Sequence, residues 1–185
     1  RAVTISIIGL IGSLALLIFM GWYLRRKVLK PISGVASAAS ELSEGHLETR
    51  VPEIGRGATV TLARSFNRMA AALQYRDRKL IEANRVAQAY YAEQLLTPAA
   101  QQARQFLTER GFDADAAKHF GVGYAPKGWD VLLTHLRAKG FSDDQLVEGG
   151  LVARGGQRGI YDRFRGRLVW PIRDTSGDVV GFGAR

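Results

Sequence analysis

The sequence YDRFRGRLVWPIRDTSGDVVGFGAR, residues 161–185, carries the clearest fold signal in this chain of 185 residues. Two β-type runs, 167–173 and 178–183, flank a four-residue turn that ends in Gly177, which is the pattern of a β-hairpin. Pro171 lacks a backbone N–H, so its strand is expected to lie at a sheet edge or to contain a bulge. Helical patterns precede the hairpin, so the region is predicted to be an α+β domain entering its sheet. These patterns cover residues 99–110, 113–120, 129–139 and 142–148.

Five arginines on or beside the hairpin are the candidate phosphate-binding residues: Arg163, Arg165, Arg167, Arg173 and Arg185. The first three alternate, so an extended strand would project them to one face. Planar guanidinium groups on one face suit phosphate groups, which predicts contact with nucleic acid. The alternative is that neighbouring Asp162 and Asp174 neutralise two of these arginines.

Three aromatic residues, Phe164, Trp170 and Phe182, are interleaved with these arginines. Such rings could stack on nucleotide bases. Aromatic residues in strands more often pack against a buried face, and we expect this of Trp170 and Phe182.

Composition excludes several classes of protein. The chain has no Cys, which excludes disulfide scaffolds, thiolate zinc sites and cysteine nucleophiles. Its three His residues are far apart in sequence, so no metal centre is expected. The net charge of +9 is concentrated in residues 1–80 and 154–185, which indicates two different anionic partners.

Residues 2–24 form an uncharged apolar run that ends in Trp22-Tyr23-Leu24 and is followed by Arg25, Arg26 and Lys27. A helix of about 20 apolar residues spans a bilayer core of roughly 30 Å. The basic cluster would mark the following residues as cytoplasmic. We therefore expect a transmembrane helix over 1–24 in the inner membrane, because a signal peptide would carry its charges before the apolar run. A buried helix is the other alternative.

The next segment contains two helical stripes joined by a connector at 46–57. The first stripe follows Pro31 and ends near Gly45, where a left-handed residue can terminate a helix. The second runs through Leu62, Phe66, Met69 and Leu73 with coiled-coil spacing. One such helix pair cannot bury both stripes alone, so a parallel homodimeric coiled coil is expected, acting either as a signal relay or as a dimerising stalk.

These residues resemble a HAMP domain, a family that links membrane sensors to cytoplasmic outputs. The resemblance covers about 25–80 and rests on Pro31, Gly45, Leu47, Val51, Phe66, Asn67 and Met69. One departure is that Gly57–Thr61 has no carboxylate where the family usually opens its second helix with an acidic pair.

Residues 81–185 resemble the N-terminal part of the catalytic core of bacterial replicative DNA primase. The matching motifs are 84–95, 103–107, 110–111, 120–126, 128–129, 161–174 and 181–185. The resemblance implies single-stranded DNA and ribonucleotides as partners, with the five arginines as candidate phosphate contacts. It also implies that magnesium is held by a carboxylate cluster, and the replicative helicase by a C-terminal region, both lying beyond Arg185. The family's zinc module requires Cys and is absent from these residues, so this chain alone is expected to be inactive.

Two functions from different classes stay open. The first is a primase fragment that binds nucleic acid, joined to a HAMP module either by a genuine fusion or in a chimeric gene model. The second is a membrane-anchored HAMP relay protein with a non-catalytic output region. The chain begins at Arg1 and stops after a strand-like run, so we expect a fragment at both ends.

Overall fold

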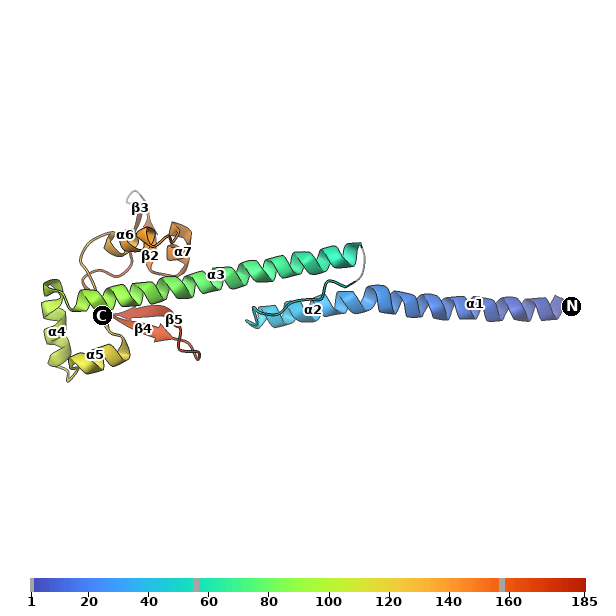
Figure 1. Ribbon diagram of the computed structural model, residues 1–185, viewed down its shortest axis with the longest axis horizontal. Coiled ribbons are helices and arrows are strands. Elements are labelled where there is room, and N and C mark those ends of the chain that lie inside the picture. The colour runs from blue at the N-terminus through green and yellow to red at the C-terminus, as the bar shows by residue number, and fades with distance from the viewer. Residues whose placement is uncertain (1, 55–56, 157–158) are drawn as a thin grey trace. The chain divides into compact units, whose positions relative to one another are not determined.

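The computed structural model describes residues 2–54, 57–156 and 159–185, except the side chains of residues 2–11, 27, 28, 30 and 31. The chain divides into two compact units, Arg1–Tyr75 and Arg76–Arg185. Figure 1 shows the order of the elements in each unit.

The first unit contains three helical segments and the start of a fourth. These are α1 (Ala2–Leu24), the π-helical turn η1 (Arg25–Leu29), α2 (Lys30–Ser43) and α3 (Ala58–Leu95). In Figure 1, α2 and the first part of α3 run in the same direction because the connector returns to the beginning of α2.

The predicted transmembrane helix over 1–24 is wrong. In the part of the chain that the structure describes, no helix combines the length and the apolar character needed to cross a bilayer. The side chains of residues 2–11 lie outside the described residues.

Helix α2 ends at a left-handed glycine, as its sequence predicts. Gly45 has φ +97°, and its N–H donates to the Leu42 carbonyl. The next N–H, of His46, reaches back to the Glu41 carbonyl at 3.0 Å. This pair of hydrogen bonds is a Schellman motif, which turns the chain into the connector.

A small core joins α2, the connector and α3. Its buried members are Ala38, Val51, Ala63, Phe66 and Ala70, with Val35 and Leu42 packed against them. Alanine at three of these positions lets the helices approach closely, so that the Phe66 ring and the Val51 side chain fill the remaining space.

Helices of the second unit follow the predicted order. After a 3₁₀ turn (η2, Pro98–Ala100) come α4 (Gln101–Thr108), α5 (Ala114–Phe120), α6 (Val131–Ala138) and α7 (Asp143–Glu148). Asp113 caps α5 by accepting the Ala116 N–H at 2.7 Å. Ser142 caps α7 in a reciprocal capping box with Gln145.

Two antiparallel sheets complete this unit. One is the hairpin β2 (Val152–Gly155) and β3 (Gly159–Asp162), and the other has the order β1-β4-β5. Its strands are β1 (Gly123–Ala125), β4 (Arg167–Arg173) and β5 (Val179–Ala184), so the predicted hairpin is confirmed.

Pro171 lies in the central strand rather than in an edge strand. Strand β1 pairs only with residues 167–169 of β4, so β5 is the only paired neighbour of β4 at Pro171. The register also shifts between Ile172 and Arg173, which is the predicted irregularity.

Helix α3 contributes to the larger of two cores in the second unit. Ala83, Ala87, Tyr90 and Tyr91 lie on its buried face, opposite residues from α6, α7 and the strands. Phe182 is packed against this core and meets Tyr91 edge to face at 5.4 Å, while Trp170 packs against the second core. The expectation that Trp170 and Phe182 belong to the core is confirmed.

Candidate nucleic-acid interface

The loop between β3 and β4 separates the candidate arginines. Strand β3 ends at Asp162 and β4 begins at Arg167, with Gly166 at φ +62° between them. Residues 163–166 therefore belong to no strand, and the prediction of one strand projecting Arg163, Arg165 and Arg167 to one face is wrong. The alternation is interrupted because the chain turns at a glycine that adopts a left-handed conformation.

Arg165 is half-buried and held by contacts within the fold. Its guanidinium lies 4.3 Å from the ring centroid of Trp129 and 5.1 Å from that of Tyr161. Its Nη1 also donates a short hydrogen bond to the carbonyl of Asp162. Contacts with two aromatic rings and a carbonyl hold this guanidinium in place, so that it fixes the loop. The same contacts leave fewer of its N–H groups free to bind an external phosphate.

The two acidic neighbours of the arginines bind backbone N–H groups instead. Asp162 is buried, and its two carboxylate oxygens accept the N–H groups of Leu132 and Leu133 at 2.8 and 2.9 Å. Burial raises the pKa of Asp162, and these backbone hydrogen bonds oppose the rise. The carboxylate thereby caps the first turn of α6 from a distant strand.

Asp174 closes the β4–β5 turn by accepting the N–H groups of Ser176 and Asp178, both at 2.9 Å. Among the described contacts, neither Asp162 nor Asp174 forms an ion pair with an arginine. The alternative in which these carboxylates neutralise Arg163 and Arg173 is therefore wrong.

Arg163 and Arg173 are exposed. The guanidinium of Arg163 lies 5.8 Å from the Phe164 ring centroid, and Nη1 of Arg173 donates to the Gly177 carbonyl at 2.8 Å. Both side chains keep further N–H donors, so each can contact a phosphate oxygen.

A cationic pocket lies where α4 meets β1 and β4. Its volume is about 240 Å³, and its lining comprises Ala99, Gln102, Ala103, Phe106, Tyr124, Lys127, Gly166, Leu168 and Arg185. We call it the Lys127–Arg185 pocket. No carboxylate lines it, and neither cation has a described hydrogen-bonding or ion-pair partner for its side chain.

Phe106, which lines this pocket, also contacts a third cation. The Arg110 guanidinium stacks on the Phe106 ring with 3.6 Å to the centroid, and Arg185 lies 5.8 Å from the same centroid. Arg167 is exposed at the beginning of β4, between the two pocket residues Gly166 and Leu168. Cations gathered around an aromatic ring can contact both the phosphates and the bases of a single strand.

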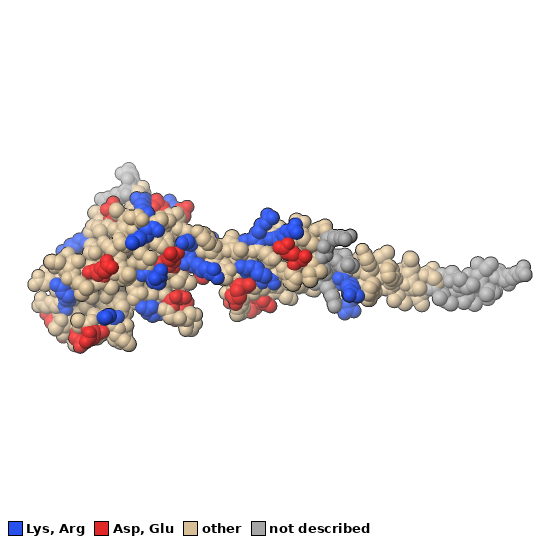
Figure 2. All heavy atoms as spheres, viewed as in Figure 1, with Lys and Arg blue, Asp and Glu red and all other residues tan. Residues whose placement is uncertain are grey.

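Local sequence patterns do not reveal this pocket. Phe106, Arg110 and Lys127 lie in or beside motifs of the resemblance, but sequence spacing gives no reason to group them with Arg185. The β1–β4 pairing does so, because Ala125 lies opposite Arg167. Figure 2 shows basic and acidic side chains interspersed over residues 76–185 in this view, so basic residues form separate groups there rather than one strip.

The HAMP-like residues of the first unit fall into two sets. Val51 and Phe66 are buried, Leu47 is half-buried, and Asn67 binds the Val51 backbone with both atoms of its side-chain amide. Met69 is exposed, together with Leu62 and Leu73 on the same helix. Pro31 lies in the first turn of α2, where proline is favoured, and its side chain is outside the described residues.

The described residues do not fit a divalent metal ion. No three carboxylate or imidazole groups among them lie close enough together to hold one. The two most suggestive carboxylates, Asp162 and Asp174, already accept backbone N–H groups.

The second unit is similar to DNA primases. Over 108 residues it is 61% identical to the DNA primase of Streptomyces coelicolor, a match that covers 58% of this chain and 17% of the relative. The DNA primase of Mycobacterium tuberculosis is 51% identical over 125 residues, covering 65% of this chain and 19% of the relative. The chain thus spans less than a fifth of the length of these curated relatives.

Solved structures show the same similarity. The RNA polymerase domain of Mycobacterium tuberculosis primase DnaG superposes with a TM-score of 0.56 at 54% identity, covering 58% of this chain and 35% of that one. A DnaG primase catalytic domain bound to single-stranded DNA gives a TM-score of 0.55 at 33% identity, covering 60% and 35%.

Two family matches divide the chain in the way its residues predict. Residues 23–75 match the HAMP domain. Residues 90–185, more than half of the chain, match the N-terminal domain of the DNA primase catalytic core. The chain therefore belongs to the DNA primase family through its second unit, and its first unit matches the HAMP domain.

Proposed function

We propose that the second unit binds single-stranded nucleic acid as the N-terminal part of a bacterial primase core. The Lys127–Arg185 pocket carries this proposal, because it places cations beside an aromatic ring and has no carboxylate in its lining. Phosphate oxygens would lie against Arg185, Lys127 and Arg110, and a base against the exposed edge of Phe106. Arg167, Arg173 and Arg163 would extend the contact along the strand, whereas Arg165 holds the loop.

The activity of the whole protein follows from its relatives and is part of the proposal. A primase makes RNA primers from ribonucleotides on a single-stranded DNA template. Residues outside this sequence would bind the magnesium that this reaction requires. The described residues would hold the template and would not assemble the metal site. Bacterial replication takes place in the cytoplasm, so the proposal puts the second unit there.

Fluorescence anisotropy of a labelled single-stranded oligonucleotide tests this proposal on the full chain. Six phosphate contacts predict a slope of log affinity against log salt of about −4, at roughly −0.7 per contact. Replacing Arg185 or Lys127 by Ala should weaken binding at least about tenfold at low salt and reduce the slope by about 0.7.

Arg137→Ala and Arg154→Ala are matched controls, because each removes one positive charge that is paired with an aspartate away from the pocket. Equal weakening by these controls would show general charge attraction and not a site. Binding without salt dependence would contradict the proposed phosphate contacts.

We propose in addition that the HAMP domain forms a homodimer through α3. Leu62, Met69 and Leu73 are 44%, 48% and 37% exposed and lie on one stripe of the helix, apart from the buried alanines. A second copy of the stripe would cover them in a coiled coil.

The absence of Cys permits a clean cross-linking test. Leu73→Cys should give a disulfide-linked dimer under mild oxidation, whereas Ala71→Cys, on the opposite side of the same helix, should give little. Equal cross-linking at both positions would exclude a defined α3 interface.

A further inference from the structure

A second cavity lies between α3 and α6, apart from the Lys127–Arg185 pocket. Its volume is about 360 Å³. Helix α3 contributes Arg85, Val86, Ala89, Tyr90 and Glu93, and α6 with its C-cap contributes His135 and Lys139. No residue is shared between the two cavities, and the function proposed above uses none of these side chains.

Helical spacing explains why a cavity forms here. Arg85, Ala89 and Glu93 follow one another at intervals of four along α3, and His135 and Lys139 do so across from them, so each set lines one wall. The small side chain of Ala89 leaves space midway between the two longer ones. Tyr90 is buried, and the half-buried His135 ring packs on it with 4.6 Å between centroids and 34° between ring planes, so the His135 ring is held in place at the cavity wall.

The two ends of this cavity differ in charge. His135 lies beside Tyr90, while Phe141, farther along the chain, lies beside Lys79 at 5.8 Å. The segment 135–141 therefore runs antiparallel to α3, which places Lys139 toward Arg85 and away from Glu93. Arg85 and Glu93 are about 12 Å apart along the helix axis at 1.5 Å per residue.

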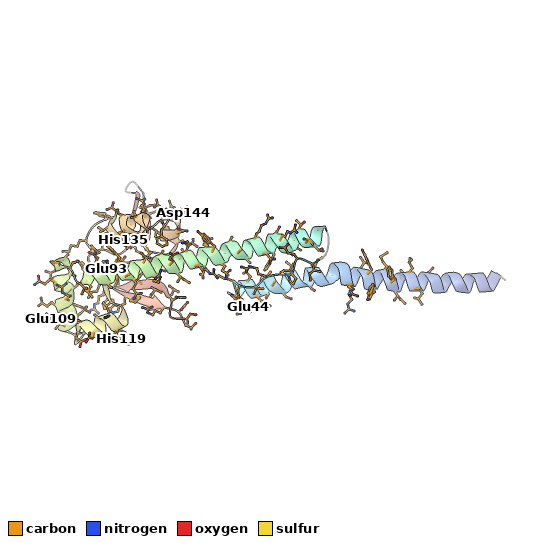
Figure 3. All side chains as sticks on the ribbon, in the orientation of Figure 1. Glu44, Glu93, Glu109, His119, His135 and Asp144 are labelled. Atoms are coloured by element: carbon orange, nitrogen blue, oxygen red, sulfur yellow. The ribbon has the colours of Figure 1, made fainter. Side chains whose placement is uncertain are left out.

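These charges are not neutralised by one another. Among the described contacts, Arg85, Lys139 and Glu93 make no hydrogen bond and no ion pair. Arg85 influences Glu82 at longer range. The pKa of Glu82 is lowered chiefly by its hydrogen bond with Lys79 and by the positive charge of Lys79, and slightly by the charge of Arg85. Figure 3 shows His135 and Glu93 close together, on α6 and α3.

We propose that this cavity binds a small phosphorylated molecule of the nucleoside monophosphate class. The phosphate lies between Arg85 and Lys139, where two cations converge. A ring of the ligand lies against the His135 ring, beside Val86. Glu93, at the far end, accepts a hydrogen bond from an amino or hydroxyl group of the ligand. The volume is within the range of small-molecule sites, roughly 300–1,000 Å³.

Proton NMR of the full chain with adenosine monophosphate tests the proposal. The chain has three His residues, and the His135→Gln variant identifies the His135 imidazole C–H signal. Adenosine monophosphate should shift this signal saturably and leave those of His46 and His119 in place. Inorganic phosphate alone should bind more weakly, because it reaches only the Arg85–Lys139 end.

The double variant Arg85→Ala with Lys139→Ala should weaken binding at least about tenfold, since two charge-assisted hydrogen bonds are lost. Arg137→Ala, which removes a cation of α6 outside the cavity, should bind as the parent chain does. No shift of the His135 signal, or the same affinity in the double variant, would overturn the proposal. Displacement of adenosine monophosphate by a single-stranded oligonucleotide would assign the cavity to nucleic acid and would also overturn it.

Discussion

The side-chain amide of Asn67 pairs with both polar atoms of the Val51 peptide backbone. Its Oδ1 accepts the Val51 N–H at 2.9 Å, and its Nδ2 donates to the Val51 carbonyl at 2.9 Å. This arrangement satisfies a backbone segment that has no strand or helix of its own. It fixes the connector to α3 at the residue that enters the core of the HAMP domain.

Replacing Asn67 by Ala should release the connector. The variant leaves a buried N–H and a carbonyl without partners, which costs about 1–3 kcal/mol. Hydrogen exchange should show the Val51 amide losing most of its protection. Arg68→Ala, an exposed neighbour on α3, is the control, and equal protection of Val51 in both variants would contradict the role of Asn67.

Replacing Asp162 by Ala should destabilise the second unit by about 2–3 kcal/mol. The change leaves the N–H groups of Leu132 and Leu133 unpaired beside the core. Asp113→Ala removes an exposed cap with one hydrogen bond and should cost about 1 kcal/mol. Urea unfolding of both variants measures the loss in free energy of unfolding that each causes. Equal losses would show that Asp162 acts only as a surface cap.

Tyr91→Phe should keep or raise stability at neutral pH. The Tyr91 hydroxyl is buried without a hydrogen-bond partner among the described residues, so its removal leaves no group unpaired. Burial, followed by the charge of Asp162, raises the pKa of Tyr91 above its ordinary value near 10.

Because the folded-state pKa of Tyr91 is raised, its contribution to stability is fully present below pH 10. It is lost as the pH rises further toward the folded-state pKa. Unfolding followed at pH 9 and pH 11 should show a larger loss in the parent chain than in Tyr91→Phe. Parallel loss in both chains would show that another group dominates alkaline unfolding.

Arg165→Lys should reduce stability by about 1–2 kcal/mol while changing oligonucleotide affinity less than Arg185→Ala does. A lysine lacks the planar guanidinium that lies close to both the Trp129 and the Tyr161 rings. Thermal unfolding and anisotropy on the same samples separate the two effects. A loss of affinity equal to that of Arg185→Ala would show that Arg165 contacts a phosphate group after all.

Local signals in the sequence were sufficient for the helices and the hairpin. Asp113 and Ser142 predict helix starts because capping depends on a few neighbouring residues, and both caps are present. Residues 121–126 read as a turn, yet β1 lies within them. A three-residue strand exists because β4 pairs with it, and this partner is more than forty residues away.

The candidate site was predicted less completely because it also depends on contacts between residues far apart in the sequence. The arginine alternation at 163–167 predicted a strand, but the left-handed Gly166 interrupts it. The contact of Arg165 with Trp129 and the backbone contacts of Asp162 join residues about thirty or more positions apart. Residue spacing identifies which charged residues are near each other along the chain. It cannot show which carboxylates accept hydrogen bonds from backbone N–H groups that are distant in the sequence.

The engagement of Asp162 and Asp174 by backbone N–H groups has a consequence for the chain in solution. The fold directs the two carboxylates that stand beside Arg163 and Arg173 in the sequence toward backbone N–H groups, so neither arginine forms an ion pair with them among the described contacts. A strand bound there, as proposed above, would give up the counterions condensed on its phosphates to bulk water. Part of the driving force for that binding would then be entropic.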